Sequence, residues 1–416
     1  MSIAPLGRRD RLTTLPPELF ALVESFIYPS CTARTYPGPY LGAVSRAFLH
    51  TARKHHFTDV WIPDYDSFGK FVAAIVGSRE TAVHPLNVSI HMEADIDDSQ
   101  VPDEDLFALL SLLVSLRSLS VQYFPRFSKV VANPPLWCHP LPELESLNLA
   151  DTFPKWRNPI DPRHWTSLDR YPALTEFHLS QERSNSEMEP HRAVETRFRP
   201  NSSITNLRIG GYQLGANPSM PAFIDLFSEA WSLTFTERSN LSRDVVTFLK
   251  SVPRPGRFLH LSIPKFPEWD PEFPAALARF EGVRGVRLPK GAWQHPQVTD
   301  VLLSLDLMVV QLADTPNVLE LVRYVKNASA LAHLAIDSTF KISRLGPSLP
   351  LDLEEQLVRR WTETFTPEGV IEVARIATEK GVRVVGDTLG RAEKIVEAKA
   401  RRDEALRRVE AESRGS

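Results

Sequence analysis

The sequence predicts an α/β fold in which short parallel strands alternate with helices as a solenoid, between a short N-terminal helical unit and a C-terminal helical cap. Three observations predict it. One apolar pattern recurs along the chain, helical periodicity fills the segments between its copies, and 34 prolines punctuate many short elements. A chain of 416 residues is also too long for one ordinary compact core unless the fold grows by repetition.

The recurring pattern is apolar-x-x-apolar-x-apolar, as in Leu144-Leu147-Leu149 and Ile204-Leu207-Ile209. Its last two apolar residues are separated by one residue, which is typical of a short strand with one buried face. Eleven copies occur at intervals of 24 to 31 residues, with final apolar positions 62, 90, 121, 149, 179, 209, 235, 263, 288, 312 and 336. We therefore expect eleven strands that lie parallel and side by side in chain order.

The residue between the two buried positions of each strand is expected to face solvent. Nine of these eleven residues are polar, as one solvated sheet face requires. They are Trp61, Ser89, Ser120, Asn148, His178, Arg208, Thr234, Ser262, Arg287, Gln311 and Ala335.

Apolar residues at helical spacing predict helices between the strands, over 103–116, 220–230, 242–252 and 296–305. Ser242 is a predicted N-cap, and Thr315-Pro316 has the form of an N-cap followed by proline at the first helical position. A strand–turn–helix unit of this length resembles the leucine-rich repeat, in a divergent form. The alternative is an alternating α/β fold whose strands happen to be evenly spaced.

After Ile336 the pattern loosens, and the remaining chain is expected to cover the last repeat. Helices are predicted over 349–364 and 367–380, the second with Thr366 as N-cap and Gly381 at its end. A last strand is predicted over Val382–Val385. Residues 391–416 hold 8 basic and 6 acidic residues, which predicts a solvated charged helix and tail; a partner-binding helix is the alternative.

These patterns divide the chain into five predicted segments. They are a disordered N-terminus (1–11), a helical unit (12–57), the repeats (58–340), a C-terminal repeat or cap region (341–390), and the charged helix and tail (391–416).

The helical unit has more apolar surface than its own fold can cover. Apolar side chains of residues 12–27 surround nearly the whole predicted helix, so one side is expected to meet an outside partner. Leu15-Pro16-Pro17-Glu18-Leu19 and Val44-Ser45-Arg46-Ala47-Phe48 resemble the opening and the later segment of the F-box. Between them, Pro37 and Pro39 forbid a regular helix. The alternative is a plain helical cap for the repeats.

An F-box followed directly by leucine-rich repeats resembles the substrate-recognition subunits of Skp–cullin–F-box ubiquitin ligases, especially those of fungi. The resemblance implies a Skp-type adaptor and, through it, a cullin as partners, with an unknown protein substrate on the repeats and no catalytic residue in this chain. The adaptor-binding residues it implies are Leu15, Pro16, Glu18, Leu19, Val23, Ile27, Val44 and Arg46. The rival hypothesis is a leucine-rich-repeat scaffold for protein interactions without a ligase.

Long loops after the third, fourth and fifth strands share a basic and aromatic composition. Loops at the same place in successive repeats stack on one edge, and aromatic and Arg side chains are enriched at binding hot spots. The predicted substrate-binding residues are Phe124, Arg126, Trp156, Arg157, Arg163, Trp165 and Arg199. The alternative is that the aromatics cover the ends of the core. In that case the site is expected along the polar row of Asn148, His178 and Arg208.

Composition and motifs count against several other classes. A net charge of -3 gives no chain-wide attraction to nucleic acid. The only two cysteines, Cys31 and Cys138, exclude a disulfide framework and a Cys-rich zinc site. No phosphate-binding loop, Gly-x-Ser-x-Gly or His-Glu-x-x-His occurs, so we expect no catalysis, metal or cofactor. No stretch is long and apolar enough for a membrane span and no signal peptide is recognisable, so a cytoplasmic or nuclear protein is expected.

Overall fold

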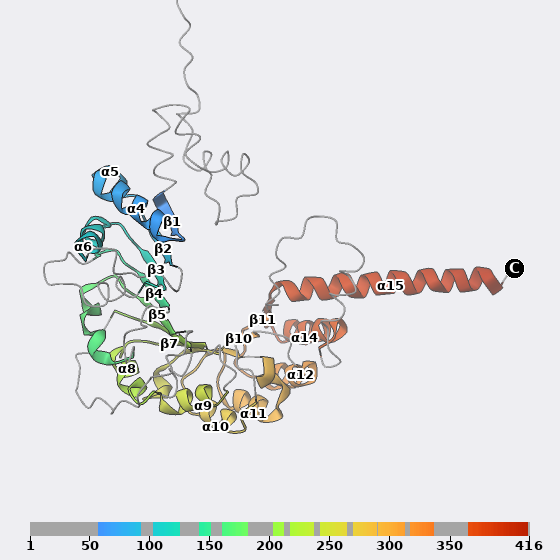
Figure 1. Cartoon of the computed structure of the whole chain (residues 1–416). Coiled ribbons are helices and arrows are strands. Elements are labelled where there is room, and N and C mark those ends of the chain that lie inside the picture. The colour runs from blue at the N-terminus through green and yellow to red at the C-terminus, as the bar shows by residue number, and fades with distance from the viewer. Residues whose placement is uncertain are drawn as a thin grey trace, which may run out of the picture. The chain divides into compact units, whose positions relative to one another are not determined.

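The structure is a computed structural model that describes residues 57–92, 103–124, 141–150, 160–181, 203–211, 217–236, 242–263, 269–288, 290–312, 317–336 and 365–414. Twelve parallel strands form one sheet in chain order, β1 to β12 (Figure 1). The bounds are β1 Asp59–Ile62, β2 Asn87–His91, β3 Ser118–Gln122, β4 Ser146–Ala150, β5 Glu176–Gln181, β6 Asn206–Gly211, β7 Ser232–Thr236, β8 His260–Ser262, β9 Gly285–Leu288, β10 Val309–Leu312, β11 His333–Ile336 and β12 Arg383–Val385. The eleven predicted strands and their order are confirmed, and the predicted last strand is β12.

The chain divides into two compact units, of which the first holds β1–β4 and the second β5–β12. In the second unit, helices α8 to α12 lie along one face of the strands (Figure 1). The helices are α4 Tyr65–Gly77, α5 Arg79–Ala82 and α6 Asp103–Leu112 in the first unit, and α8 Met220–Leu226, α9 Ser242–Ser251, α10 Phe273–Ala278, α11 Pro296–Ser304, α12 Val318–Asn327, α14 Pro367–Glu379 and α15 Asp387–Arg414 in the second. Short 3₁₀ helices are η3 Pro162–His164, η4 Thr166–Arg170, η5 Pro255–Arg257 and η6 Lys290–Gln294.

The four helices predicted between the strands are confirmed, but two of them end earlier than expected. Helix α6 ends at Leu112 and α8 at Leu226, whereas the sequence pattern carried them to 116 and 230. Leu116 and Ala230 instead lie in turns, where their N–H groups donate to the carbonyl groups of Leu113 and Phe227. These two apolar residues are buried as the first members of the next strand pattern, which is why they also fitted a helical spacing.

Two predicted helix starts differ in detail. Ser242 is the first residue of α9 rather than the residue before it. The prediction of Thr315 as N-cap is wrong: α12 begins at Val318, and the Asn317 side chain accepts the N–H of Leu319 at 3.0 Å. Residues 315–316 and the helix predicted over 349–364 lie outside the described residues.

The strand register aligns the inner apolar residues of successive repeats. In the first unit Ile62 pairs with Ile90, and in the second Leu179 pairs with Ile209 and Leu288 with Leu312. All of these side chains are buried. They pack on the helices, as where the ring of Phe235 in β7 stacks on that of Phe248 in α9 with centroids 4.1 Å apart. A one-residue slip of any strand would turn this apolar row to solvent.

The middle residues of the strands, on the opposite face of the sheet, are at least partly exposed as predicted, with one exception. Among the eleven middle residues, Arg208 is exposed, and nine others are half-buried. Ser262 is buried, contrary to the prediction. Its strand, β8, is the shortest of the eleven, and Ser262 is flanked in the register by the larger Thr234 and Arg287.

A carbonyl ladder at the start of the strands fixes the register. The carbonyl group just before a strand accepts two N–H groups from the next repeat. The Trp231 carbonyl accepts from Leu259 at 2.8 Å and His260 at 3.1 Å, and the Leu259 carbonyl accepts from Arg284 and Gly285. The same arrangement occurs in the first unit at Leu86 and Arg117.

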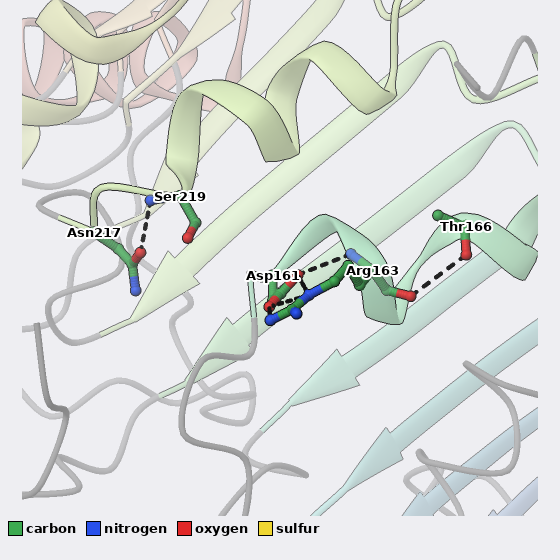
Figure 2. A network of polar contacts seen from close by, with 5 residues as sticks. All are labelled: Asp161, Arg163, Thr166, Asn217 and Ser219. Carbon is green, nitrogen blue, oxygen red and sulfur yellow. Dashed lines mark hydrogen bonds and ion pairs between the residues drawn. The ribbon is translucent and has the colours of Figure 1, made fainter. Parts of the chain in front are cut away.

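Many helical segments begin with an Asx–Pro turn, in which an Asp or Asn side chain accepts the N–H two residues on. The turns Asp161-Pro162-Arg163 and Asn217-Pro218-Ser219 have this contact at 2.9 Å (Figure 2). Asp270-Pro271-Glu272 has it at 2.8 Å. Pro162 is the first residue of η3, where its missing N–H group and preset φ suit the helix start, whereas Pro218 and Pro271 lie in the turns before α8 and α10. This use accounts for part of the high proline content.

Basic side chains of the second unit complete the C-terminal ends of helices in an earlier repeat. Arg257 donates to the carbonyl oxygen of Ile224 in α8 and to that of Ser228 just after it. Arg279 donates to the carbonyl oxygen of Leu249 in α9. Lys380 donates to Val325 and Ala328 around the end of α12. A cation at this position satisfies free carbonyl groups and complements the helix dipole.

The C-terminal region follows its prediction closely. The Thr366 hydroxyl accepts the N–H of Gly369 at 3.1 Å, and Gly381, with φ of 75°, ends α14. The Val382 N–H reaches the Ala377 carbonyl at 2.8 Å, which completes a Schellman motif. Helix α15 starts beside α14 and runs on past it (Figure 1). Lys399 of α15 pairs with Glu368 of α14 at 3.1 Å.

Substitution of Gly282 tests the packing between repeats. A Cβ atom at Gly282 would lie 1.9 Å from the carbonyl oxygen of Gly256 in the previous repeat. We expect Gly282→Ala to lower the free energy of unfolding by about 1–3 kcal/mol, because backbone must move to relieve the overlap. Gly256→Ala is the matched control, since a Cβ there meets nothing within 4 Å. Equal urea midpoints for the two variants would contradict this packing.

Candidate functional site

Most of the predicted site residues lie outside the described part of the chain. This holds for all the predicted adaptor-binding residues: Leu15, Pro16, Glu18, Leu19, Val23, Ile27, Val44 and Arg46. It also holds for four predicted substrate-binding residues: Arg126, Trp156, Arg157 and Arg199. The structure describes the other three, Phe124, Arg163 and Trp165.

The prediction that Phe124 and Trp165 face a partner is wrong for this conformation. Both are completely buried. The Phe124 ring packs edge-on against Phe68, with centroids 5.2 Å apart, and the Trp165 ring lies 5.0 Å from that of Phe177. Each ring fills space at the end of the apolar core, the role that was the alternative to a recognition surface.

Arg163 is exposed, but its guanidinium group is engaged within its own turn (Figure 2). Its Nε atom donates to both carboxylate oxygens of the buried Asp161, at 3.0 and 2.9 Å. Burial would raise the pKa of the Asp161 carboxyl, but the hydrogen bonds from Arg163 outweigh it and hold the pKa below its ordinary value. The structure therefore gives Arg163 the task of satisfying a buried charge.

The polar row predicted as the alternative binding site is present on β5 to β10 of the second unit. The strand register places its members side by side: His178, Arg208, Thr234, Ser262, Arg287 and Gln311. Arg208 and Arg287 are three strands apart, about 14 Å at the usual spacing of parallel strands. The hydroxyl residues Thr234 and Ser262 occupy the strands between them. Asn148, the third residue named with this row, belongs to the first unit and donates to Ser120 at 2.9 Å.

Two histidines next to the arginines are held neutral. Burial and then the charge of Arg208 lower the pKa of His178 to about 4. Burial and then the charge of Arg287 also lower the pKa of His260. The imidazole of His260 lies between the Ser232 hydroxyl, 3.4 Å from its Nδ1 atom, and Gly285, where a Cβ would meet it at 3.0 Å. The positive charge of this row at neutral pH is therefore carried by its arginines.

Buried polar atoms without partners mark the same row. Among the described residues, His178 Nε2 and Arg287 Nε are both buried without a hydrogen-bond partner. Leaving such a group unsatisfied costs about 1–3 kcal/mol. Both atoms are enclosed by the protein.

Four exposed apolar side chains lie at the starts of β7, β8 and β10. They belong to residues of the carbonyl ladder and to the first residue of β10. The exposed fractions are 44% for Trp231, 49% for Leu259, 49% for Met308 and 38% for Val309. Arg284, which pairs with Asp306 at 3.7 Å, stands between Leu259 and Met308 in the ladder. Exposed large aromatic and apolar groups beside Arg are typical of protein-binding surfaces.

We call the solvent-facing side chains of β6 to β10 the strand face. They include Arg208, Thr234, His260, Arg287, Val309 and Gln311. No residue of β6 to β10 is Asp or Glu, so the strand face is basic and apolar. Acidic residues near these strands in the sequence include Glu229 before β7, Glu237 after it, Glu281 before β9 and Asp306 before β10.

Only the middle residue of each strand was predicted to face solvent, so these exposed apolar side chains were not predicted. The signal was present, because Trp231, Leu259 and Met308 each directly follow the first apolar residue of the repeated pattern. At that position the chain has not yet entered the alternating strand, and the side chain points to solvent.

No model of a known protein family matches the chain, and no curated protein matches it. Across the described ranges, no three His, Cys, Asp or Glu residues gather as a metal-ligand group. None of the described helices combines the length and apolar character needed to cross a membrane.

Two tryptophans of the second unit test the assignment of buried and exposed rings. We expect Trp165→Ala to lower the free energy of unfolding by about 3–5 kcal/mol, because it leaves a cavity in the core. Trp231→Ala should cost less, about 1 kcal/mol, since that side chain is 44% exposed. Chemical denaturation measures both. Similar losses from the two variants would contradict the assignment.

The pH dependence of stability tests the environment of His178. Its folded-state pKa of about 4 lies below the ordinary 6.5, so between these values the unfolded chain binds more protons. Stability should therefore be complete above the ordinary pKa and fall as the pH falls, by about 2 kcal/mol near pH 5. In His178→Gln, the unfolding free energy measured in urea should therefore fall by about 2 kcal/mol less between pH 7 and 5 than in the natural chain. Parallel curves for the variant and the natural chain would contradict a buried neutral imidazole.

Proposed function

We propose that this protein is the substrate-recognition subunit of a Skp–cullin–F-box ubiquitin ligase, with a leucine-rich-repeat-like solenoid as its substrate-binding part. The observation that supports it most is the order of the chain. An F-box-like segment over 12–57 is followed directly by parallel strands in chain order, whose period of 24 to 31 residues suits that repeat.

In this function the two parts have separate roles. Residues of the F-box-like segment hold the adaptor, and the strand face holds a protein substrate. Lysines of the substrate are then brought near a ubiquitin-loaded enzyme that the complex supplies. The chain contributes binding and geometry, and no catalytic group. Such a role belongs to the cytoplasm or the nucleus.

Double substitution of Leu15 and Pro16 by Ala tests the adaptor contact. We expect it to abolish pull-down of a Skp-type adaptor, because it removes the apolar start of the presented helix. Pro5 and Leu6 to Ala is the matched control, since it makes the same two changes in the segment before the F-box-like unit. The thermal melt followed by circular dichroism should be nearly unchanged in both.

Two results would count against the ligase role. If the Leu15/Pro16 variant lowers the melting temperature of the repeats, the segment is a cap of the repeats. If the natural chain does not bind the adaptor at all, the second candidate function, a protein-interaction scaffold, gains support. Pro37 and Pro39 favour that candidate, because they interrupt the middle of the F-box-like segment.

A further inference from the structure

We propose that the first unit carries a binding surface for an uncharged, proline-containing segment of a partner protein in the polyproline II conformation. The proposed function places a substrate on the strand face of the second unit, so this surface goes beyond it. Three observations carry the proposal: a row of contacting rings, a strained tyrosine in that row, and the absence of charged side chains on the neighbouring strands.

The rings of Trp61, His91 and Tyr123 form a continuous row, which we call the aromatic row. The Trp61 ring lies 6.2 Å from that of His91, and the His91 ring meets that of Tyr123 edge-on at 5.5 Å between centroids. His91 is exposed, and the other two are half-buried. Since these residues lie on β1, on β2 and directly after β3, the row runs across the strands. Trp and Tyr rings offer a broad apolar surface with a polar group at the rim, which suits a peptide partner.

Tyr123 has a backbone conformation that a bulky residue rarely adopts, with φ of 56°. In a regular strand it would point to the buried side, as Val121 does two residues earlier. The alternation breaks here instead, because the Tyr123 ring lies against His91 and Phe124 enters the core. Residues held in such strained conformations cluster at sites that clamp ligands. In this case the strained residue supplies one ring of the aromatic row.

Hydroxyl and amide side chains cover the solvent-facing side of the strands next to the aromatic row. Strands β2 to β4 contain no Asp, Glu, Lys or Arg. Along each strand these polar side chains alternate with buried residues, and each of them is half-buried or exposed. The strand register sets them side by side, and we call them the hydroxyl–amide grid: Asn87, Ser118 and Ser146 in one row, Ser89, Ser120 and Asn148 in the next, and Gln122 beside His91.

The charged residues beside the grid already pair with partners of their own. Asp59 on β1 accepts an N–H of the Asn87 amide at 2.6 Å. Arg117, before β3, lies 3.9 Å from the carboxylates of Glu143 and Glu145. A charged group laid on the grid would lose water without gaining a counter-ion. The surface therefore selects an uncharged segment.

A polyproline II segment matches this surface. It has no internal hydrogen bonds, so its carbonyl groups are free to accept, and the side chains of the grid supply donors. Proline lacks an N–H group and adds a rigid apolar ring that packs on aromatic side chains. One turn of this helix advances about 9 Å in three residues, so two prolines three residues apart reach the two ends of the aromatic row.

A random peptide library displayed on phage, selected on the purified full chain, tests the proposal. We expect selected peptides to be enriched in proline, with pairs three residues apart, and depleted in charged residues. A selected peptide should bind Tyr123→Gly about tenfold more weakly in fluorescence anisotropy, and Trp61→Ala by a similar factor. Glycine suits the φ of residue 123, so the first variant removes the ring without straining the backbone. Trp231→Ala is the control, because this exposed tryptophan belongs to the second unit and should not affect binding.

A matched pair of charge variants tests the grid separately from the rings. Ser120→Glu puts a carboxylate in the middle of the grid and should abolish binding of the selected peptide. Thr234→Glu adds the same charge at the equivalent position of β7 in the second unit and should leave binding unchanged. Both side chains are half-buried middle residues of their strands. The affinity of the natural chain should change less than about twofold between about 0.05 and 0.5 M NaCl, because no charge pair forms.

Several results would overturn the proposal. They are selection of charged or proline-free peptides, selection of none, equal affinity for Tyr123→Gly and the natural chain, or binding of sugars on a glycan array in place of peptides. The ligase role is tested apart from it, because all these variants should still capture the adaptor. Peptide binding without adaptor capture removes the ligase role alone. Adaptor capture without peptide binding removes the proline-segment proposal alone.

Discussion

At seven steps between successive repeats, two N–H groups donate to a single carbonyl group of the repeat before, and the arrangement of the strands depends on this contact. At Trp231 and again at Leu259 the pair of donors fixes where the next strand begins. Because side chains alternate along a strand, fixing its start also fixes which residues are buried. Each hydrogen bond contributes only about 1 kcal/mol, but the same contact recurs from repeat to repeat.

The second constraint is that the helices are short, so many of their backbone N–H and C=O groups lie at helix ends and need partners outside the helix. Helix α10 has 6 residues and α8 has 7, so free end groups are a large share of their backbone. The Asx–Pro turns satisfy N–H groups at the starts, and Arg257, Arg279 and Lys380 satisfy carbonyl groups at the ends. Since those cations come from a later repeat, each repeat is completed by a following one. A single repeat would leave these groups to water.

The sequence predicted the strands well because their signal is local and repeated. Buried pairs such as Leu233 and Phe235 have to alternate wherever a strand has one apolar face. Composition alone predicted the site poorly, because an aromatic residue in a loop suits a binding surface and a core equally. Trp165 and Phe124 turn inward, which depends on long-range packing against Phe177 and Phe68. The exposed row of Trp231, Leu259 and Met308 became visible only when the carbonyl ladder placed these residues side by side.

The same register explains why a basic strand face is compatible with a stable sheet. Like charges directly opposite on neighbouring strands destabilise a sheet, and here Thr234 and Ser262 separate Arg208 from Arg287. His178 stands directly beside Arg208, and its pKa of about 4 keeps it uncharged there. His260 is kept neutral beside Arg287 in the same way. The strand register thus holds the two guanidinium groups apart, with uncharged side chains on the strands between them.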